Sequence, residues 1–425
     1  MYYRQTDNLN ERVESKSILV LMSIYMSSIP LFTAHGPLNV ISQIFFVLAF
    51  GGCALYMVLR GVNFRYDTSL MWFAGFILWC FIGILWSKDR DISVSMIITL
   101  IQLFALFLIM YSYISAYENI GSFVVALLIA GFICSLVVIG YYGLGEYIKL
   151  MLEGQRLGAP ITNVNIIGLY SATTAIICFF YGYLKGKRWS YILMVLPLIT
   201  AFGSGSRKAL VMIALGVLFL IFMKYRESIS IKGFFKLLAM LCVIVVIIYW
   251  MTTMPIFEGA FERFEQMLGM DGTVRDGSTR VRMRMIQAGW DYFKLHPYTG
   301  VGIGNSGYIT LEYIGYTTYL HNNFIEILAS VGVFGFLIYY AMYAYLVIEL
   351  YRVAIRANDD YATLMLIIIV TQLILSYGAV LYYDKMTYIY AAMAAATVSI
   401  GKRKIFEMEL EENDKNTEKN QEVIE

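Results

Sequence analysis

Three side chains in this sequence are candidates for chemistry: Arg207, Arg282 and His321. Arginine keeps its charge at any physiological pH and can donate paired hydrogen bonds to phosphate oxygens. Histidine titrates closest to neutral pH, so it can accept or deliver a proton. Two arginines and a histidine on one face would therefore suit a reaction in which an anionic group departs.

Arg282 lies in a segment whose spacing predicts a helix from Ser278 or Thr279, either of which can cap it, to about Leu295. At the helical period, polar side chains share one face: Arg280, Arg284, Gln287, Asp291 and Lys294. Two apolar stripes flank Arg282, one of Val281, Met285, Ala288 and Tyr292 and one of Ile286, Trp290 and Phe293. We therefore expect its guanidinium to lie against protein or membrane. The equal alternative is that it snorkels to lipid headgroups or pairs with a carboxylate.

Arg207 and His321 lie at the edges of apolar segments. Arg207 follows a Gly-Ser-Gly-Ser reversal between two such segments, and Lys208 adds charge beside it. An ionisable residue at a membrane edge is a functional candidate, although anchoring at the interface is an equal alternative. His321 begins another apolar segment, in which Asn323 and Glu326 have the spacing of a capping box. That cap accounts for the asparagine and the glutamate but not for the histidine, for which a structural role is the alternative.

A glycine-rich run follows His296-Pro297, with glycines at 300, 302, 304 and 307 that permit tight turns. It lacks the Lys-Ser/Thr ending of a phosphate-binding loop, so we interpret it as a turn rather than a nucleotide site. Asp89 and Asp91 resemble a metal-binding acid pair, but such short patterns arise by chance. The five cysteines lie in apolar segments without metal-ligand spacing. We therefore expect neither a metal site nor a cofactor.

The elements that must position these residues are membrane helices. Hydrophobic residues make up 59% of the 425 positions and charged residues only 15%, far from the usage of soluble proteins. Continuous apolar runs predict spanning helices rather than the alternating strands of a barrel. We predict an all-α polytopic membrane protein with about 12 transmembrane helices and one large, partly helical extracytoplasmic loop. The predicted spans begin near Ile18, Leu38, Ser69, Ile92, Ile120, Asn163, Trp189, Lys208, Phe234, Asn322, Tyr361 and Met386.

The basic residues predict which side each loop faces. Lysine and arginine concentrate in alternate loops, which the positive-inside rule assigns to the cytoplasm together with the N-terminus. The predicted organisation is a cytoplasmic N-terminus (1–17), about nine spans (18–254), an extracytoplasmic loop with amphipathic helices (255–320), about three spans (321–400) and a cytoplasmic tail (401–425). The net charge of +2 gives no indication of nucleic-acid binding.

Motifs between Arg156 and Phe336 carry a resemblance to a known family. The strongest match runs from Arg282 through His296-Pro297 and Gly300-Val-Gly-Ile-Gly304 to His321-Asn322 and the segment from Phe324 to Gly335. Weaker matches are Gly203-Ser-Gly-Ser-Arg207 and Arg156 to Asn165. The sequence resembles the O-antigen ligase and O-antigen polymerase superfamily of bacterial membrane glycosyltransferases. It departs from that pattern at Ile286, where tryptophan is frequent, and at Ser330, where an acid is common.

The resemblance implies transfer of a glycan from an undecaprenyl-diphosphate carrier to an acceptor hydroxyl on the outer face of the bacterial cytoplasmic membrane. No nucleotide, metal or cofactor would take part, and the partners would be the lipid-linked donor, a glycan or lipid-linked acceptor and membrane lipids. The implied catalytic residues are Arg207, Arg282 and His321. Arg207 and Arg282, with Arg156, would hold the diphosphate, while His321 orients or deprotonates the acceptor. Further predicted substrate-binding residues are Asn165, Arg280, Arg284 and Asn322.

The sequence is also compatible with other functions. Within the superfamily, a polymerase extends another lipid-linked chain and a ligase attaches glycan to a different acceptor; we lean to a polymerase because no dedicated acceptor site is evident. A flippase or transporter of lipid-linked oligosaccharide would also need outer cations, but we find neither an internal repeat nor paired interrupted helices. A structural subunit of a glycan assembly complex is a third possibility. It would tolerate alanine at all three candidate positions.

Overall fold

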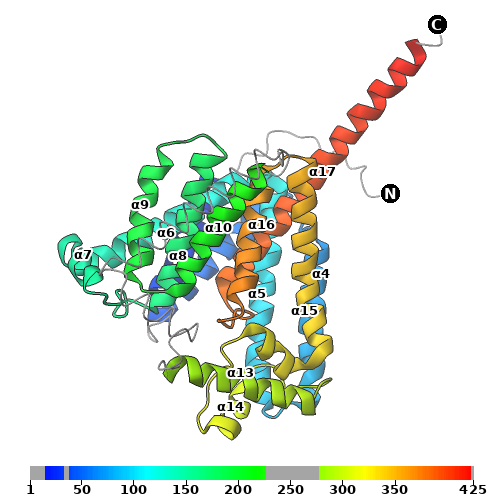
Figure 1. Cartoon of the computed structure of the whole chain (residues 1–425). Coiled ribbons are helices and arrows are strands. Elements are labelled where there is room, and N and C mark those ends of the chain that lie inside the picture. Colours follow the sequence, from blue (N-terminus) through cyan, green and yellow to red (C-terminus); the bar gives the residue numbers. More distant parts are fainter. Residues whose placement is uncertain (1–14, 33–37, 226–276, 423–425) are drawn as a thin grey trace.

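The chain forms a bundle of helices, described here from a computed structural model that covers residues 15–32, 38–225 and 277–422 (Figure 1). Within these ranges the regular elements are helical and no strand is present. The elements are α1 (Lys16–Phe32), α2 (Asn39–Phe46), η2 (Val47–Gly51), α3 (Gly52–Leu59), α4 (Thr68–Gly83), η3 (Ile84–Trp86), α5 (Arg90–Tyr117), α6 (Ile120–Tyr142), α7 (Leu144–Leu152), α8 (Val164–Tyr183), α9 (Ser190–Gly203), α10 (Arg207–Tyr225), α13 (Gly277–Leu295), α14 (Ser306–Ile314), α15 (Asn323–Arg356), α16 (Asp360–Leu375) and α17 (Lys385–Glu422).

The predicted spans coincide with these helices, except the one expected near Phe234, which lies outside the described residues. Among the described residues, seven helices are long and apolar enough to cross a membrane: the continuous segment Asn39–Leu59, then Thr68–Trp86, α5, α6, α8, α10 and α15. α1, α9 and α16 are apolar but shorter. The expected multi-pass, all-helical fold is therefore confirmed, whereas the number of about 12 spans and the outward position of the loop stay predictions.

Short polar residues start many of the helices. An asparagine or aspartate side chain accepts hydrogen bonds from backbone amides in the first turn, which satisfies donors that have no partner inside the helix. The residues that do so are Asp67 for α4, Asp89 for α5, Asn119 for α6, Asn163 for α8, Asn322 for α15 and Asp359 for α16. Asp89 is thus the helix cap of α5.

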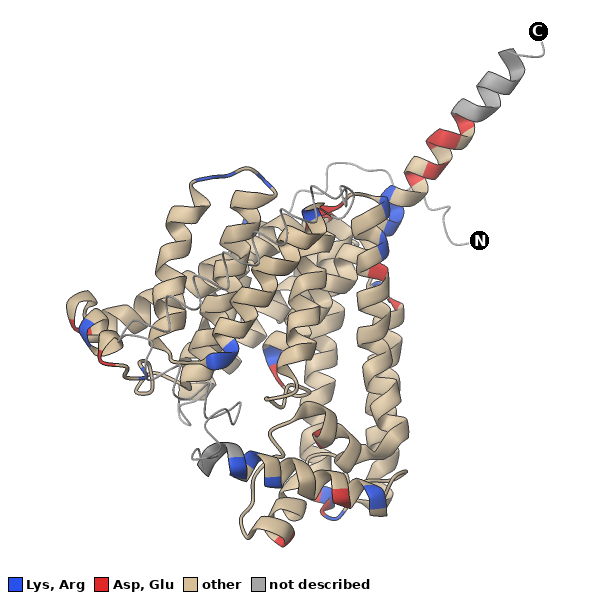
Figure 2. Cartoon of the chain, viewed as in Figure 1, with Lys and Arg blue, Asp and Glu red and all other residues tan. Residues whose placement is uncertain are grey.

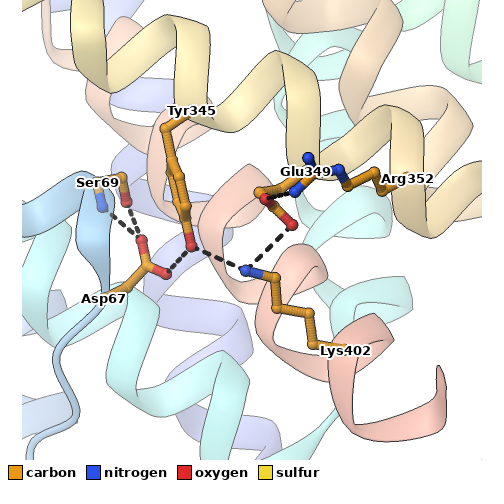
Figure 3. A network of polar contacts seen from close by, with 6 residues as sticks. All are labelled: Asp67, Ser69, Tyr345, Glu349, Arg352 and Lys402. Atoms are coloured by element: carbon orange, nitrogen blue, oxygen red, sulfur yellow. Dashed lines mark hydrogen bonds and ion pairs between the residues drawn. The ribbon is translucent and has the colours of Figure 1, made fainter. Parts of the chain in front are cut away.

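A polar network joins α4, α15 and α17 at one end of the bundle (Figure 3). The Tyr345 hydroxyl donates to Asp67 (2.9 Å), the residue that caps α4. Lys402 Nζ lies between the Tyr345 oxygen (3.3 Å) and the Glu349 carboxylate (3.1 Å). Arg352 donates to the other oxygen of Glu349 (2.6 Å). This network holds the three helices together at the end opposite α13 and α14 (Figure 1).

α13 and α14 cross the other end of the bundle and share a small core (Figure 1). Met285 and Ala288 of α13 are buried there with Leu320, and Val281 and Tyr292 pack against them. The predicted stripe of Val281, Met285, Ala288 and Tyr292 is thus confirmed, whereas Trp290 of the second predicted stripe is exposed. On the polar face, Asp291 accepts from Lys294 (2.8 Å) and from Gln287. Because Met285 and Ala288 are buried, the opposite face of α13 is the exposed one.

The glycine-rich run is a turn, as predicted, and it fills a break in α15. Gly332 has non-helical backbone angles (φ 70°, ψ −175°), so the helix is interrupted there. The amides of Val301 and Gly302 donate to the freed carbonyl groups of Ala329 (2.9 Å) and Ser330 (2.9 Å). In return, the Val333 amide donates to the Pro297 carbonyl (2.8 Å). The turn therefore replaces the hydrogen bonds that the break removes and anchors the end of α13 to α15.

This packing predicts that Gly300→Ala lowers stability more than Gly315→Ala does. Both glycines have positive φ (65° and 94°), so both variants carry the same type of backbone strain. A Cβ at position 300 would lie 2.4 Å from the Ser330 carbonyl carbon, whereas at position 315 nothing lies within 4 Å. Crowding of a packed site costs about 1–3 kcal/mol, beyond the strain itself. Thermal unfolding of both purified variants measures the difference, and equal midpoints would contradict the packing described here.

Candidate functional site

Arg282, Lys208 and His321 come together from segments far apart in the sequence. Burial, followed by the positive charges of Arg282 and then Lys208, lowers the pKa of His321 to about 4. Figure 2 shows Lys and Arg residues on α13 and in the first turn of α10 at the same end of the bundle. The imidazole is therefore uncharged at neutral pH and has a free nitrogen lone pair beside two cations.

Arg282 is exposed on α13 rather than packed against protein. No ion pair joins it to another described residue, so the carboxylate partner considered from the sequence is not observed in this part of the chain. Its charge acts instead on His321 and Lys208. A guanidinium whose charge repels a neighbouring cation favours binding of an anion, because the anion would relieve the repulsion.

Lys208 is the member of this group that the sequence did not single out. It is the second residue of α10, half-buried, and its Nζ donates a hydrogen bond to the carbonyl of Gly378 in the α16–α17 connection. Its position beside Arg207 was the available signal, but sequence alone counted it only as additional charge. Lys208 thus links the start of α10 to the connection between α16 and α17.

Residues next to His321 in the chain fix its position. Its own backbone is left-handed (φ 57°), and its ring packs against that of Tyr319 in a tilted arrangement with centroids 4.1 Å apart. The buried Glu326 carboxylate accepts from the Leu320 amide (2.8 Å) and from the Ser306 hydroxyl (2.5 Å). The residue before His321 is therefore tied to both α14 and α15, which gives the imidazole a defined position.

The predicted capping box at this helix start is wrong in its residues. Asn322, not Asn323, caps α15, accepting from the amides of Phe324 (2.9 Å) and Ile325 (3.1 Å). Asn323 lies one residue into the helix and accepts instead from the Leu381 amide (2.8 Å). The reason is tertiary: the buried Asn323 side chain holds the α16–α17 connection, so its neighbour takes the capping role.

Arg156 and Asn165 form a second group beside Arg207. Arg156 donates to the carbonyl of Ser204 (3.3 Å) and to Oδ1 of Asn165 (3.2 Å). The same Asn165 oxygen accepts from the Ser206 hydroxyl (3.2 Å), and Arg207 follows directly as the first residue of α10. The structure thus brings together three of the predicted residues at the α9–α10 connection, the segment that also supplies Lys208.

The remaining predicted residues differ in exposure. Arg280 and Arg284 are exposed on α13, on either side of Arg282 in the sequence. Asn322 is buried, with its side-chain oxygen engaged by the helix it caps. Substrate binding by these residues stays a prediction. The arrangement as a whole offers cations for an anionic group and an uncharged imidazole for a proton.

The region that contains the candidate site matches a known protein family. Residues 189–340 match the family model described as O-antigen ligase. That range contains Arg207, Lys208, Arg282 and His321, together with the glycine-rich turn; Arg156 and Asn165 precede it. A comparison with curated proteins found no match. The match of residues 189–340 to the O-antigen ligase model supports the resemblance of this chain to the O-antigen ligase and O-antigen polymerase superfamily.

Proposed function

We propose that this protein transfers a glycan from undecaprenyl diphosphate to an acceptor hydroxyl at the outer face of the bacterial cytoplasmic membrane. The observation that carries the proposal is the uncharged His321 beside Arg282 and Lys208. The family match supports a membrane ligase or polymerase of polysaccharides, which handles lipid-linked glycans. Our proposal adds the identity of the donor, the identity of the acceptor and the role of each residue.

The chemistry asks two things of the protein. The acceptor oxygen attacks the anomeric carbon, the bond from that carbon to the diphosphate oxygen breaks, and its electron pair leaves with the diphosphate. Arg282 and Lys208 stabilise the negative charge that develops on this oxygen, Arg282 through paired hydrogen bonds and Lys208 as a point charge. His321 accepts the hydroxyl proton through its free nitrogen. The products are the extended or ligated glycan and undecaprenyl diphosphate.

Binding of the donor would also prepare the base. In the empty site, the charges of Arg282 and Lys208 contribute to the low pKa of His321. A bound diphosphate cancels these charges and places negative charge nearby, which raises the pKa of the imidazole. His321 therefore becomes the stronger base only when the donor occupies the site. This coupling between donor binding and the basicity of His321 keeps the imidazole unprotonated until the donor is bound.

The acceptor distinguishes a polymerase from a ligase. The polymerase would use the end of a second lipid-linked chain, and the ligase a different surface acceptor. We favour the polymerase of a surface polysaccharide, because no feature of the described chain marks a dedicated acceptor. At the α9–α10 connection, the donor diphosphate or its first sugar would be held by Arg207, Arg156 and Asn165. We assign them this role because they adjoin Lys208.

Reconstitution separates this proposal from transport. Purified protein in liposomes receives undecaprenyl-diphosphate glycan with a labelled sugar, and product length and carrier orientation are followed together. We expect chain growth with release of undecaprenyl diphosphate, without added nucleotide. Movement of the carrier between leaflets without any new glycosidic bond would instead identify a flippase. Liposomes with the His321→Ala protein serve as the control for contaminating transferases.

A further inference from the structure

A groove lies between α1, α6, α8 and α9, away from the proposed site. Its volume is about 690 Å³, within the range of ligand pockets in proteins. The lining includes the first residues of α1, the start of α6, the last turn of α8 and the start of α9. All four are helix ends on the side of the basic 184–189 connection, which the positive-inside rule assigns to the cytoplasm.

The groove changes character along its length. Lys16, Lys187 and Trp189 line it at the helix ends, where a lipid headgroup region would begin. Val20 and Ile129 line it deeper, and both are exposed to the surroundings of the bundle (57% and 40%). Ile129 is nine residues into α6, about 13 Å along the helix axis, which approaches the depth of one hydrocarbon leaflet. The groove thus has a cationic mouth and an apolar floor that is close to the depth of one hydrocarbon leaflet.

Two lysines at this end have no acidic partner among the described residues. Lys185, in the same connection, pairs with Asp360 (2.8 Å). Other basic residues at this end also have acidic partners, such as Arg403 with Glu118 (3.0 Å). Lys16 and Lys187 are exposed and form no ion pair with a described acidic residue. Their positive charge therefore remains for a ligand at the mouth of the groove.

We propose that this groove binds one anionic phospholipid of the adjacent leaflet. The lipid phosphate lies between Lys16 and Lys187, and one acyl chain lies against Val20 and Ile129. Apolar surface favours any lipid here, whereas Lys16 and Lys187, which have no acidic partner among the described residues, favour an anionic headgroup. Each lysine contributes about a fivefold gain in affinity, so roughly 25-fold together. The site is independent of glycan transfer.

Native mass spectrometry of the full-length protein in detergent tests the proposal, with titrated phosphatidylglycerol or phosphatidylcholine as the probe. We expect the wild type to retain phosphatidylglycerol with at least tenfold higher affinity. Lys16→Gln/Lys187→Gln should lose most of this preference and still bind phosphatidylcholine. Lys88→Gln/Lys149→Gln removes the same net charge from exposed lysines elsewhere and should keep the preference.

A second variant tests the apolar floor without changing charge. Val20→Trp places a large side chain in the groove, and we expect it to lower retention of both lipids at least fivefold, while its thermal midpoint shows whether the protein is folded. Equal affinity for the two lipids in the wild type would overturn the proposal. So would an unchanged preference in Lys16→Gln/Lys187→Gln, because the bound lipid would then be a general annular lipid.

Discussion

Arg282→Gln is expected to lower kcat for glycan transfer by about 10²–10³, the usual effect of removing one donor that stabilises developing charge. Arg282 is exposed on α13, and its charge reaches both His321 and Lys208. Glutamine keeps similar packing but removes the charge and the paired donors. Arg282→Lys should recover only part of the rate, because an ammonium group cannot form the same two parallel hydrogen bonds with phosphate. Product formation by purified variants in liposomes measures the change.

Lys294→Gln is the matched control for Arg282. It removes a positive charge from the same helix, but Lys294 pairs with Asp291 (2.8 Å) on the polar face of α13. Its rate should stay within about twofold of the wild type, since an exposed pair of this kind contributes little energy. A similar loss of activity in both variants would show that the effect reflects the fold or charge of α13. The specific role of Arg282 would then be contradicted.

His321→Gln is expected to lower kcat by about 10²–10⁴, the usual contribution of a positioned general base. Glutamine retains hydrogen-bonding capacity yet cannot accept the acceptor's proton at neutral pH. The loss should be accompanied by retained donor binding, because the cations remain. Wild-type kcat together with normal protein abundance in His321→Gln or His321→Ala would remove the histidine from the mechanism.

The pH dependence follows from the same residue. The neutral imidazole is the active form, so the rate is full above the pKa of His321 and is lost as pH falls through it. For kcat/KM, which reports the empty site, the acid limb should lie near pH 4. For kcat, the limb should lie at higher pH, because the bound diphosphate raises the pKa. His321→Gln should lack this limb in both profiles.

The helices and part of the site could be predicted because their signals are local. Apolar length placed the helices, and spacing within α13 correctly identified the buried side of Met285 and Ala288. Lys208 was missed because its neighbours are distant: Gly378 is 170 residues away along the chain. The capping residue of α15 was wrong by one position for the same reason, since Asn323 serves a contact 58 residues away.

The glycine-rich turn was likewise predicted from local sequence, whereas its tertiary contacts were not. Glycines at 300 and 302 predicted a tight turn, which the structure contains. That the turn supplies hydrogen bonds to a break at Gly332 could not be read from composition, because an interrupted helix has the same apolar sequence as a continuous one. Tertiary backbone pairing determined this part of the fold, and it also anchors the end of α13 to α15.

An NMR titration of His321 tests the central claim most directly. The ring signals of the three histidines are followed against pH with and without undecaprenyl diphosphate, and His321→Gln assigns the signal. We expect a pKa near 4 for His321 in the empty protein, because of burial and the two cations, and a clear rise when the diphosphate binds beside Arg282 and Lys208. Saturating diphosphate that leaves the pKa of His321 unchanged would contradict a diphosphate site at this histidine.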